Sequence, residues 1–244
     1  MGVYITGDTH GRNDTDKLNY KRFPDSRSLT KKDIVIIAGD FGGVFYGGNK
    51  GQRILDWYNE LPFTVCFVDG NHENFDLLKT YPTEMWHGGK VQRIHDSIYH
   101  LMRGEIYDIE GKSYFTFGGG LSIDACNRIP NISWWEEEEP SYAECEYALS
   151  NLEAHGNKVD YIITHAAPEF IVRNDLRQIT HLYCMDCACE KFLNTVLDTV
   201  QYENWFCGHY HLDARIRSYN LDVLYQRIIK IAPGFPIATR EPRR

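Results

Sequence analysis

Five short motifs place Asp, Asn or His directly after short apolar runs in this 244-residue chain. Carboxylate oxygens, amide oxygens and imidazole nitrogens are the donors that hard and borderline divalent ions prefer. Their number suits two ions that share a carboxylate. Two ions roughly 3.5–4 Å apart can clamp a phosphate for in-line attack at phosphorus, so the pattern predicts a metal-dependent phosphoester hydrolase. The motifs are Gly7-Asp8-Thr9-His10-Gly11, Gly39-Asp40, Gly70-Asn71-His72-Glu73, Thr164-His165 and Gly208-His209-Tyr210-His211.

The runs before the motifs consist of apolar and β-branched residues, which is typical of strands buried on both faces. Strands are predicted at Val3–Thr6, Ile34–Ala38, Thr64–Val68, Tyr161–Thr164 and Asn204–Cys207. Helices are predicted at Gln52–Glu60, Asn74–Thr80, Ser141–His155 and Asp186–Gln201. Because strands alternate with helices, we expect a layered α/β domain.

The middle of the chain predicts part of a second sheet. An antiparallel meander is expected from closely spaced strands at Ser97–Leu101, Gly104–Ile109 and Ser113–Phe117. One or two further strands are expected within Val223–Ile231. The segments Thr83–Ser97 and Ser122–Pro140 are expected to be irregular excursions.

Local signals mark two helix starts. Ser141 with Glu144 predicts a capping box, and Asp186 is the expected N-cap of the last helix. The acidic run Glu136–Glu139 is interpreted as a solvated face.

The five motifs in this order resemble those of the calcineurin-like metallophosphoesterase superfamily, from Asp8 to His211. The resemblance implies two mixed sheets packed face to face and flanked by helices, an αββα sandwich. The strand and helix pattern agrees with this fold, which we expect to occupy residues 1–244 as a single domain.

The resemblance also implies how the ligands are shared. Asp8, His10 and His211 would hold the first ion, and the carboxylate of Asp40 would bridge to the second. The remaining ligands would be Asn71, His165 and His209. The donor set suits manganese, iron, zinc, nickel or cobalt. A water or hydroxide that bridges the ions, with its pKa lowered to around 7, would be the nucleophile.

His72 follows the candidate ligand Asn71, and the family uses this histidine without binding metal through it. It would donate to the phosphoryl oxygen or protonate the leaving alkoxide, because the ordinary pKa of histidine is close to working pH. The alternative is that His72 only orients a neighbouring side chain.

Several residues depart from relatives that act on proteins. The second motif continues as Phe41-Gly42-Gly43, without the arginine that protein Ser/Thr phosphatases carry, and Asp69 stands before Gly70. These departures disfavour a phosphoprotein substrate. Phosphomonoesterase or phosphodiesterase activity on small or nucleotide-like substrates is favoured.

Two other readings stay open. One is a non-catalytic metal-binding scaffold of the same fold, although all candidate ligands and His72 are present. The other is a nuclease. The net charge of −8, from 26 basic and 34 acidic residues, disfavours long nucleic acid, which is gripped through a basic surface.

Substrate choice is assigned to residues around the metal site. Arg12 and Arg128 could reach a phosphate, although each could also be an ordinary surface residue. Trp135 could stack on an aromatic group, and the alternative, which is favoured, is that it packs the loop against the core. The segment from Ser122 to Trp135 is expected to border the site, because loops on a rigid scaffold commonly carry recognition.

Seven cysteines, odd in number and unevenly placed, indicate reduced thiols in a cytoplasmic protein. Cys184, Cys187 and Cys189, with His181, have donor types that suit zinc, but small core cysteines are the favoured interpretation. No secretory signal is visible, and no apolar run approaches the roughly 20 residues of a membrane span. Substrate identity, metal identity and oligomeric state are left open.

Overall fold

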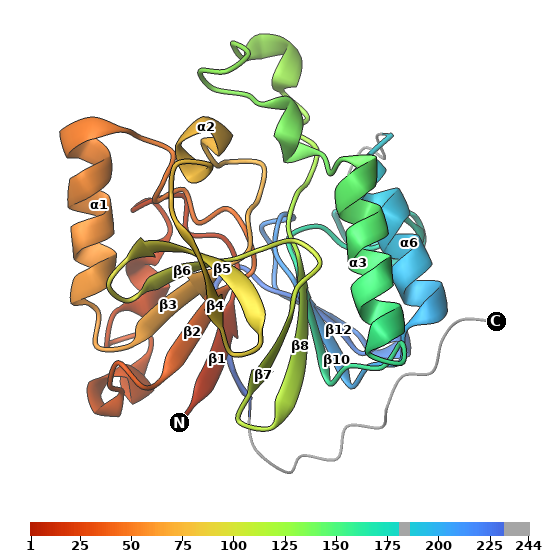
Figure 1. Cartoon of the computed structure of the whole chain (residues 1–244), viewed down its shortest axis with the longest axis horizontal. Helices are drawn as coiled ribbons and strands as arrows, with labels where there is room; N and C mark the ends of the chain where they lie inside the picture. Colours follow the sequence, from red (N-terminus) through yellow and green to blue (C-terminus); the bar gives the residue numbers. More distant parts are fainter. Residues whose placement is uncertain (181–185, 232–244) are drawn as a thin grey trace.

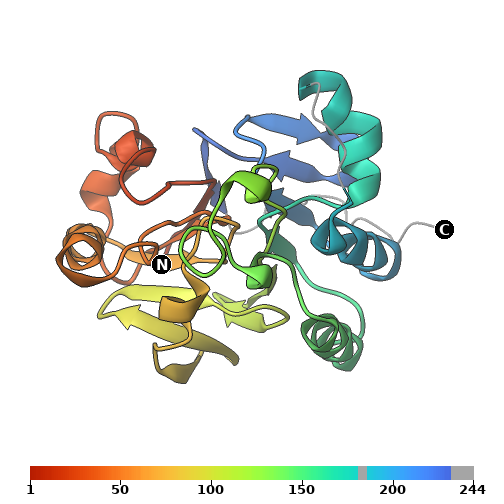
Figure 2. The same cartoon turned by 90° about the horizontal axis from the view of Figure 1, so that it is seen from above.

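A computed structural model describes residues 1–180 and 186–231. Two mixed sheets pack face to face (Figures 1 and 2). The first sheet has the order β13-β1-β2-β3-β6-β5-β4, and its strands are β1 (Val3–Thr6), β2 (Ile34–Ile37), β3 (Thr64–Phe67), β4 (Thr83–Trp86), β5 (Gly89–His95), β6 (Ile98–Leu101) and β13 (Ile228–Ile231). The second has the order β11-β12-β10-β9-β8-β7, with β7 (Ile106–Ile109), β8 (Lys112–Phe117), β9 (Tyr161–Thr164), β10 (Asn204–Cys207), β11 (Ala214–Ile216) and β12 (Leu221–Val223).

Helices lie outside the two sheets, α1 on one side and α3 with α6 on the other (Figure 1). The α-helices are α1 (Gly48–Glu60), α2 (Phe75–Leu78), α3 (Tyr142–Ala154), α4 (Glu169–Ile171), α5 (Arg177–Thr180) and α6 (Ala188–Thr199). Short 3-10 turns are η1 (Thr15–Leu18), η2 (Pro24–Ser28), η3 (Ala125–Asn127), η4 (Glu136–Glu138) and η6 (Arg217–Tyr219), and Val172–Leu176 forms a π-helical turn. Among the described residues, no helix is long and apolar enough to cross a membrane.

Three apolar clusters hold these layers together. Ile5 and Ile36 of the first sheet meet Ile163 and Phe206 of the second between the sheets. A second cluster joins the outer face of the first sheet to α1, and a third joins the outer face of the second sheet to α3 and α6. Both faces of β1, β2, β3, β9 and β10 are therefore buried, as their continuous apolar runs predicted.

The predicted strands before the motifs are confirmed, and β2 and β3 end one residue earlier than expected. The meander prediction was wrong in part. Ile98–Leu101 belongs to the first sheet, where it pairs parallel with β3 and antiparallel with β5. Of the three predicted strands, only those observed as β7 and β8 form a hairpin in the second sheet. Close spacing along the chain does not distinguish a hairpin from a crossing between sheets.

The segment 83–97 is not irregular, because β4 and β5 form an antiparallel hairpin there. The strand β4 lies at the sheet edge and alternates between exposed and half-buried residues, so it lacks a continuous apolar run. The segment 122–140 is mostly irregular as predicted, and it lies above the junction of the two sheets (Figures 1 and 2).

The Ser141–Glu144 capping box is confirmed. The Asp186 prediction was wrong: the Cys187 thiol caps α6 by accepting from the Glu190 N–H, while exposed Asp186 pairs with Lys191. The acidic run is not uniformly solvated either, because Glu138 is buried.

A buried ion pair ties the segment 122–140 to the first sheet. Arg103 donates to Asp69 Oδ2 through Nε at 2.9 Å and Nη2 at 2.6 Å. Its Nη2 also donates to the Glu137 carbonyl at 2.7 Å. Burial would raise the pKa of Asp69, but Arg103 and His100 lower it well below its usual range.

We expect Arg103→Met to lower the free energy of unfolding by about 3–5 kcal/mol, because Asp69 would keep a buried charge without its main partner. Arg93→Met is the control, since Arg93 pairs with Asp96 at 3.4 Å on the surface and its loss should cost about 0–1 kcal/mol. Urea unfolding measures both. If both variants lose the same free energy of unfolding, the buried pair stabilises the fold no more than the surface pair does.

Candidate metal centre

The candidate ligands all follow the ends of parallel strands. Asp8, Asp40 and Asn71 come after β1, β2 and β3, which run parallel in the first sheet. His165 and His209 come after β9 and β10, which run parallel in the second. Because such ends share one edge of a sheet, the packing of the two sheets brings the five motifs to one place.

One group of ligand atoms is formed by Asp8, His10, Asp40 and His211, whose donor atoms all lie within 4.8 Å of one another. The His10 Nε2 is 3.2 Å from Asp40 Oδ2, and the His211 Nε2 is 3.2 Å from Asp8 Oδ2. Burial works to lower the pKa of His10, but Asp40 and Asp8 raise it overall. The carboxylates thus favour positive charge at this position.

A second group surrounds the Nε2 atom of His165. It lies 3.0 Å from Asn71 Oδ1, 3.1 Å from His209 Nδ1 and 3.3 Å from Asp40 Oδ1. The His165 Nδ1 is 3.0 Å from the Ala38 carbonyl and must donate to it, so the ring in its neutral, metal-binding form would direct a lone pair from Nε2 toward the group. Asp40 therefore faces one group with each of its oxygens.

The chemistry of this donor set fits divalent cations. Asp8 is fully buried, and its Oδ2 has no hydrogen-bond partner among the described residues. Burial would lower the pKa of His165, yet Asp40 and Asp8 raise it to about 9. The contact of this Asp8 oxygen with His211 Nε2 at 3.2 Å is not a hydrogen bond. Buried carboxylate oxygens that accept no hydrogen bond are costly unless a cation compensates them, so the residues present suit bound metal.

Two further side chains, neither of them predicted from the sequence, orient the candidate ligands. Asp14 Oδ2 accepts from His10 Nδ1 at 2.7 Å, which directs Nε2 toward Asp40. The Asn71 amide donates through Nδ2 to Ser122 Oγ at 3.1 Å, which turns Oδ1 toward His165. The spacing of four residues from His10 could have indicated Asp14, whereas nothing local indicated Ser122.

His72 lies beside this centre and is partly open to solvent. Its backbone N–H donates to Asp40 Oδ1 at 2.8 Å, and its ring Nε2 lies 4.0 Å from Asp40 Oδ2. Two guanidinium nitrogens of Arg128 lie 3.3 Å from the two ring nitrogens, and the Arg128 Nε is held by Asp124 at 2.9 Å. Burial lowers the pKa of His72, Asp40 opposes this shift, and Arg128 adds to it.

A cavity of about 480 Å³ opens on the centre, and we name it the front pocket. Its lining residues are Asp40, Asn71, His72, Leu121, Ile123, Asp124, Arg128, Val172, Cys187, Glu190, His209, Tyr210 and His211. The segment 122–135 thus borders the centre through Ile123, Asp124 and Arg128, as expected.

The structure places the other two predicted substrate residues differently. Trp135 is buried in the core, donates to Asp76 at 2.9 Å and packs on Phe45, so it does not line the front pocket. Trp135 therefore packs the loop against the core, as the favoured interpretation had it, and its assignment to the substrate was wrong. An apolar side chain in a loop gives no sign in the sequence of which way it faces. Arg12 is exposed and lines a separate hollow that opens on His10.

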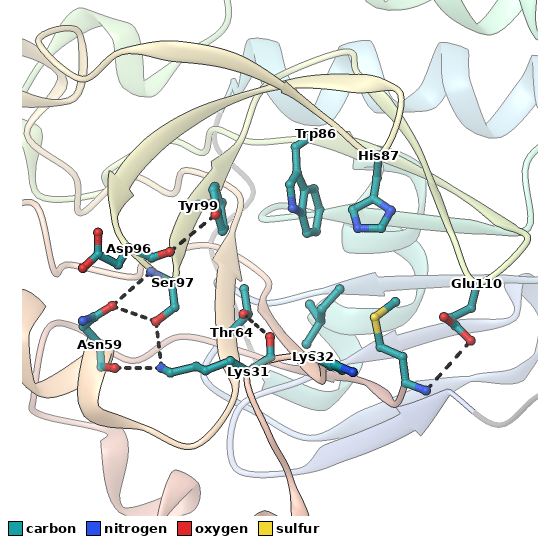
Figure 3. A pocket seen from close by; sticks show the side chains of 12 residues that line it. Lys31, Lys32, Asn59, Thr64, Trp86, His87, Asp96, Ser97, Tyr99 and Glu110 are labelled. Carbon is teal, nitrogen blue, oxygen red and sulfur yellow. Dashed lines mark hydrogen bonds and ion pairs between the residues drawn. The ribbon is translucent and has the colours of Figure 1, made fainter.

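A further hollow of about 600 Å³ is shown in Figure 3. It is lined by Ile34, Thr64 and Ser97, which stand at or before the starts of β2, β3 and β6. The candidate ligands follow the opposite ends of β2 and β3. Lys31 in this hollow already donates to Asn59, Phe63 and Ser97. No candidate ligand lines it.

The cysteine cluster is described in part, since His181 and Cys184 lie outside the described residues. Cys187 and Cys189 are buried; the Cys189 thiol approaches the Gly118 and Gly119 carbonyls at 3.5 and 3.4 Å. Both described thiols thus occupy core positions.

A sequence model of the calcineurin-like phosphoesterase family matches residues 1–213, so the chain belongs to this family. Among curated proteins, the sequence search found no match. One solved structure with a similar fold is the phosphopantetheinyl hydrolase of Mycobacterium tuberculosis, with 16% identity, a TM-score of 0.42, and coverage of 97% of this chain and 98% of the other. Another is the sulfate thiohydrolase SoxB of Thermus thermophilus, with 11% identity, a TM-score of 0.44, and coverage of 92% and 51%.

Asp14→Asn should weaken metal binding by about 10–100-fold, because carboxylates that orient ligating histidines typically contribute this much. Asp16→Asn is the matched control, since Asp16 is exposed two residues away. Competition with a fluorescent chelator measures both affinities. If the two variants bind metal equally well, the contact between Asp14 and His10 does not orient a ligand.

Proposed function

We propose that the protein is a phosphoester hydrolase that holds two divalent ions and acts on small or nucleotide-like phosphomonoesters or phosphodiesters. The observation that carries the proposal is that the two oxygens of the Asp40 carboxylate face different groups of donor atoms. Its Oδ2 lies 3.2 Å from His10 in one group of donors, and its Oδ1 lies 3.3 Å from His165 in the other. A carboxylate in this position suits a shared ligand.

The first ion would be held by Asp8, His10 and His211 with Asp40, and the second by Asn71, His165 and His209 with Asp40. When bound, such ions polarise a phosphoryl oxygen and lower the pKa of a water molecule. Manganese, iron, zinc, nickel and cobalt all suit these donors.

His72 and Arg128 supply the remaining chemistry from the protein itself. The His72 ring borders the front pocket with its nitrogens 3.3 Å from the guanidinium of Arg128. Arg128 can only donate hydrogen bonds, so it is suited to receive a phosphoryl oxygen. We assign His72 the role of donor to the phosphoryl oxygen or to the leaving alkoxide.

The size of the front pocket favours a compact substrate over a polymer. The net charge of −8 disfavours a nuclease acting on long nucleic acid. A non-catalytic scaffold is disfavoured because every candidate ligand and His72 are retained. We place the protein in the cytoplasm on the strength of its uneven cysteine usage.

The direct test is a screen of phosphate monoesters and diesters with protein reconstituted separately with each of the five metals. Hydrolysis that depends on added metal and is abolished by a chelator supports the proposal. Metal binding without turnover of any ester would favour the scaffold.

Asp40→Asn should lose at least one ion and nearly all activity, because an amide keeps one oxygen donor and carries no charge. Elemental analysis of the purified variant, with Asp16→Asn as control, measures the first effect. An active Asp40→Asn protein that retains two tightly held ions would refute the shared-ligand role.

His72→Ala should keep both ions yet lose roughly 10²–10⁴-fold in rate, the usual contribution of general acid–base catalysis. The loss should be smaller for nitrophenyl esters, whose leaving group needs no proton. His155→Ala provides an exposed control away from the centre. An equal loss for alkyl and nitrophenyl esters would restrict His72 to the phosphoryl oxygen.

A further inference from the structure

A second cavity adjoins the centre on the side of His10, and we name it the basic hollow. Its volume is about 560 Å³. It is lined by His10, Gly11, Arg12, Asn13, Tyr46, Asn49, Lys50, Arg53 and Ile54. Three of these residues are cations and none is acidic, although acidic residues outnumber basic ones in the chain by 34 to 26.

The three cations are held in place by helix geometry and aromatic rings. Lys50 and Arg53 are three residues apart on α1, so they lie on the same face of the helix. The Arg12 guanidinium lies 3.9 Å from the ring centre of Trp57, one turn further along that face. The Lys50 ammonium lies 3.2 Å from the ring centre of Tyr46. These contacts position positive charge without neutralising it.

No carboxylate in residues 1–180 or 186–231 lies within ion-pair distance of the side chains of Arg12, Lys50 or Arg53. Arg128, on the other side of the centre, is paired with Asp124. Clustered positive charge that is already positioned and unpaired attracts an anionic group with little reorganisation.

We propose that the basic hollow is a subsite for a second phosphate group of the substrate. This inference rests on the proposed function, because it places the scissile phosphate at the metal centre beside His10. Three cations match a phosphate dianion better than a single carboxylate charge, and arginine binds phosphate oxygens in pairs. The preferred substrates are therefore esters with a second phosphate. The oxygen of water forms a bond to the first phosphorus, and the bond between that phosphorus and the ester oxygen breaks. One proton of the water ends on the ester oxygen, and the alcohol leaves with the second phosphate attached.

Binding can be measured without catalysis. Calorimetric titration of chelator-treated protein with inorganic pyrophosphate should detect a site that Arg53→Ala and Lys50→Ala each weaken by roughly tenfold, the typical loss for a charge-assisted hydrogen bond. Both residues are exposed on α1, so the variants should fold. Arg27→Ala, which removes an exposed arginine stacked on Tyr20, should bind like the parent.

Turnover supplies the second measurement. Alkanediol bisphosphates of increasing chain length are compared with the alkyl monophosphates of the same length and with ω-carboxyalkyl phosphates. One bisphosphate length should be preferred in kcat/KM, and Arg53→Ala should reduce that preference by roughly tenfold. Arg27→Ala should keep it.

If the ratio of kcat/KM for bisphosphates to that for monophosphates is the same in the parent and in Arg53→Ala, the subsite is overturned. An equal slowing of every ester in Arg53→Ala would also overturn it, because the cations would then only steer anions in general. A higher rate for ω-carboxyalkyl phosphates than for bisphosphates would overturn the choice of phosphate. If no ester is hydrolysed with any metal, the proposed function fails, and the calorimetric titration alone decides whether the basic hollow binds phosphate.

Discussion

Two buried carboxylates of the first sheet join it to the ligand-bearing turns of the second, and the centre depends on this contact. Asp8 Oδ1 accepts from the His209 N–H at 3.0 Å, and Asp40 Oδ1 lies 3.3 Å from the His165 ring. Charges buried this deeply are costly unless they are paired. The histidines around them offset part of this cost, and the remaining need for positive charge makes the edge of the sandwich a site for cations.

The motifs approach one another so closely that some of the residues before the candidate ligands have no space for a side chain. A Cβ atom at Gly70 would lie 2.1 Å from Asp40 Oδ1, and one at Gly208 would lie 2.2 Å from Asp8 Oδ1. The glycines before Asn71 and His209 are therefore steric requirements of the neighbouring motifs. Four candidate ligands, His10, Asp40, His209 and His211, also have left-handed backbone angles. Non-glycine residues rarely adopt these angles, and they cluster where function demands them.

The centre and its surroundings are built from different parts of the fold. The candidate ligands stand at the ends of buried strands, where packing fixes their positions. The front pocket is completed by the segment 122–140, which Arg103 anchors through the Glu137 carbonyl, and the basic hollow is completed by α1. This arrangement suits a rigid centre that would bind the phosphate group of any ester. The two surrounding surfaces would then distinguish one ester from another.

The sequence by itself determined the five buried strands before the motifs and the donor types that the motifs carry, because a continuous apolar run indicates burial on both faces and a motif contains its own donors. The αββα architecture and the sharing of the candidate ligands were implied by the resemblance to the family. Tertiary structure decided the rest. It assigned Ile98–Leu101 to the first sheet, buried Trp135, and placed Asp14 and Ser122 behind His10 and Asn71. It also gathered Arg12, Lys50 and Arg53 around one hollow, where none of the three pairs with a carboxylate of the described residues. A local pattern shows that a residue is buried or charged, but the partner comes from distant parts of the chain, and only packing determines which one.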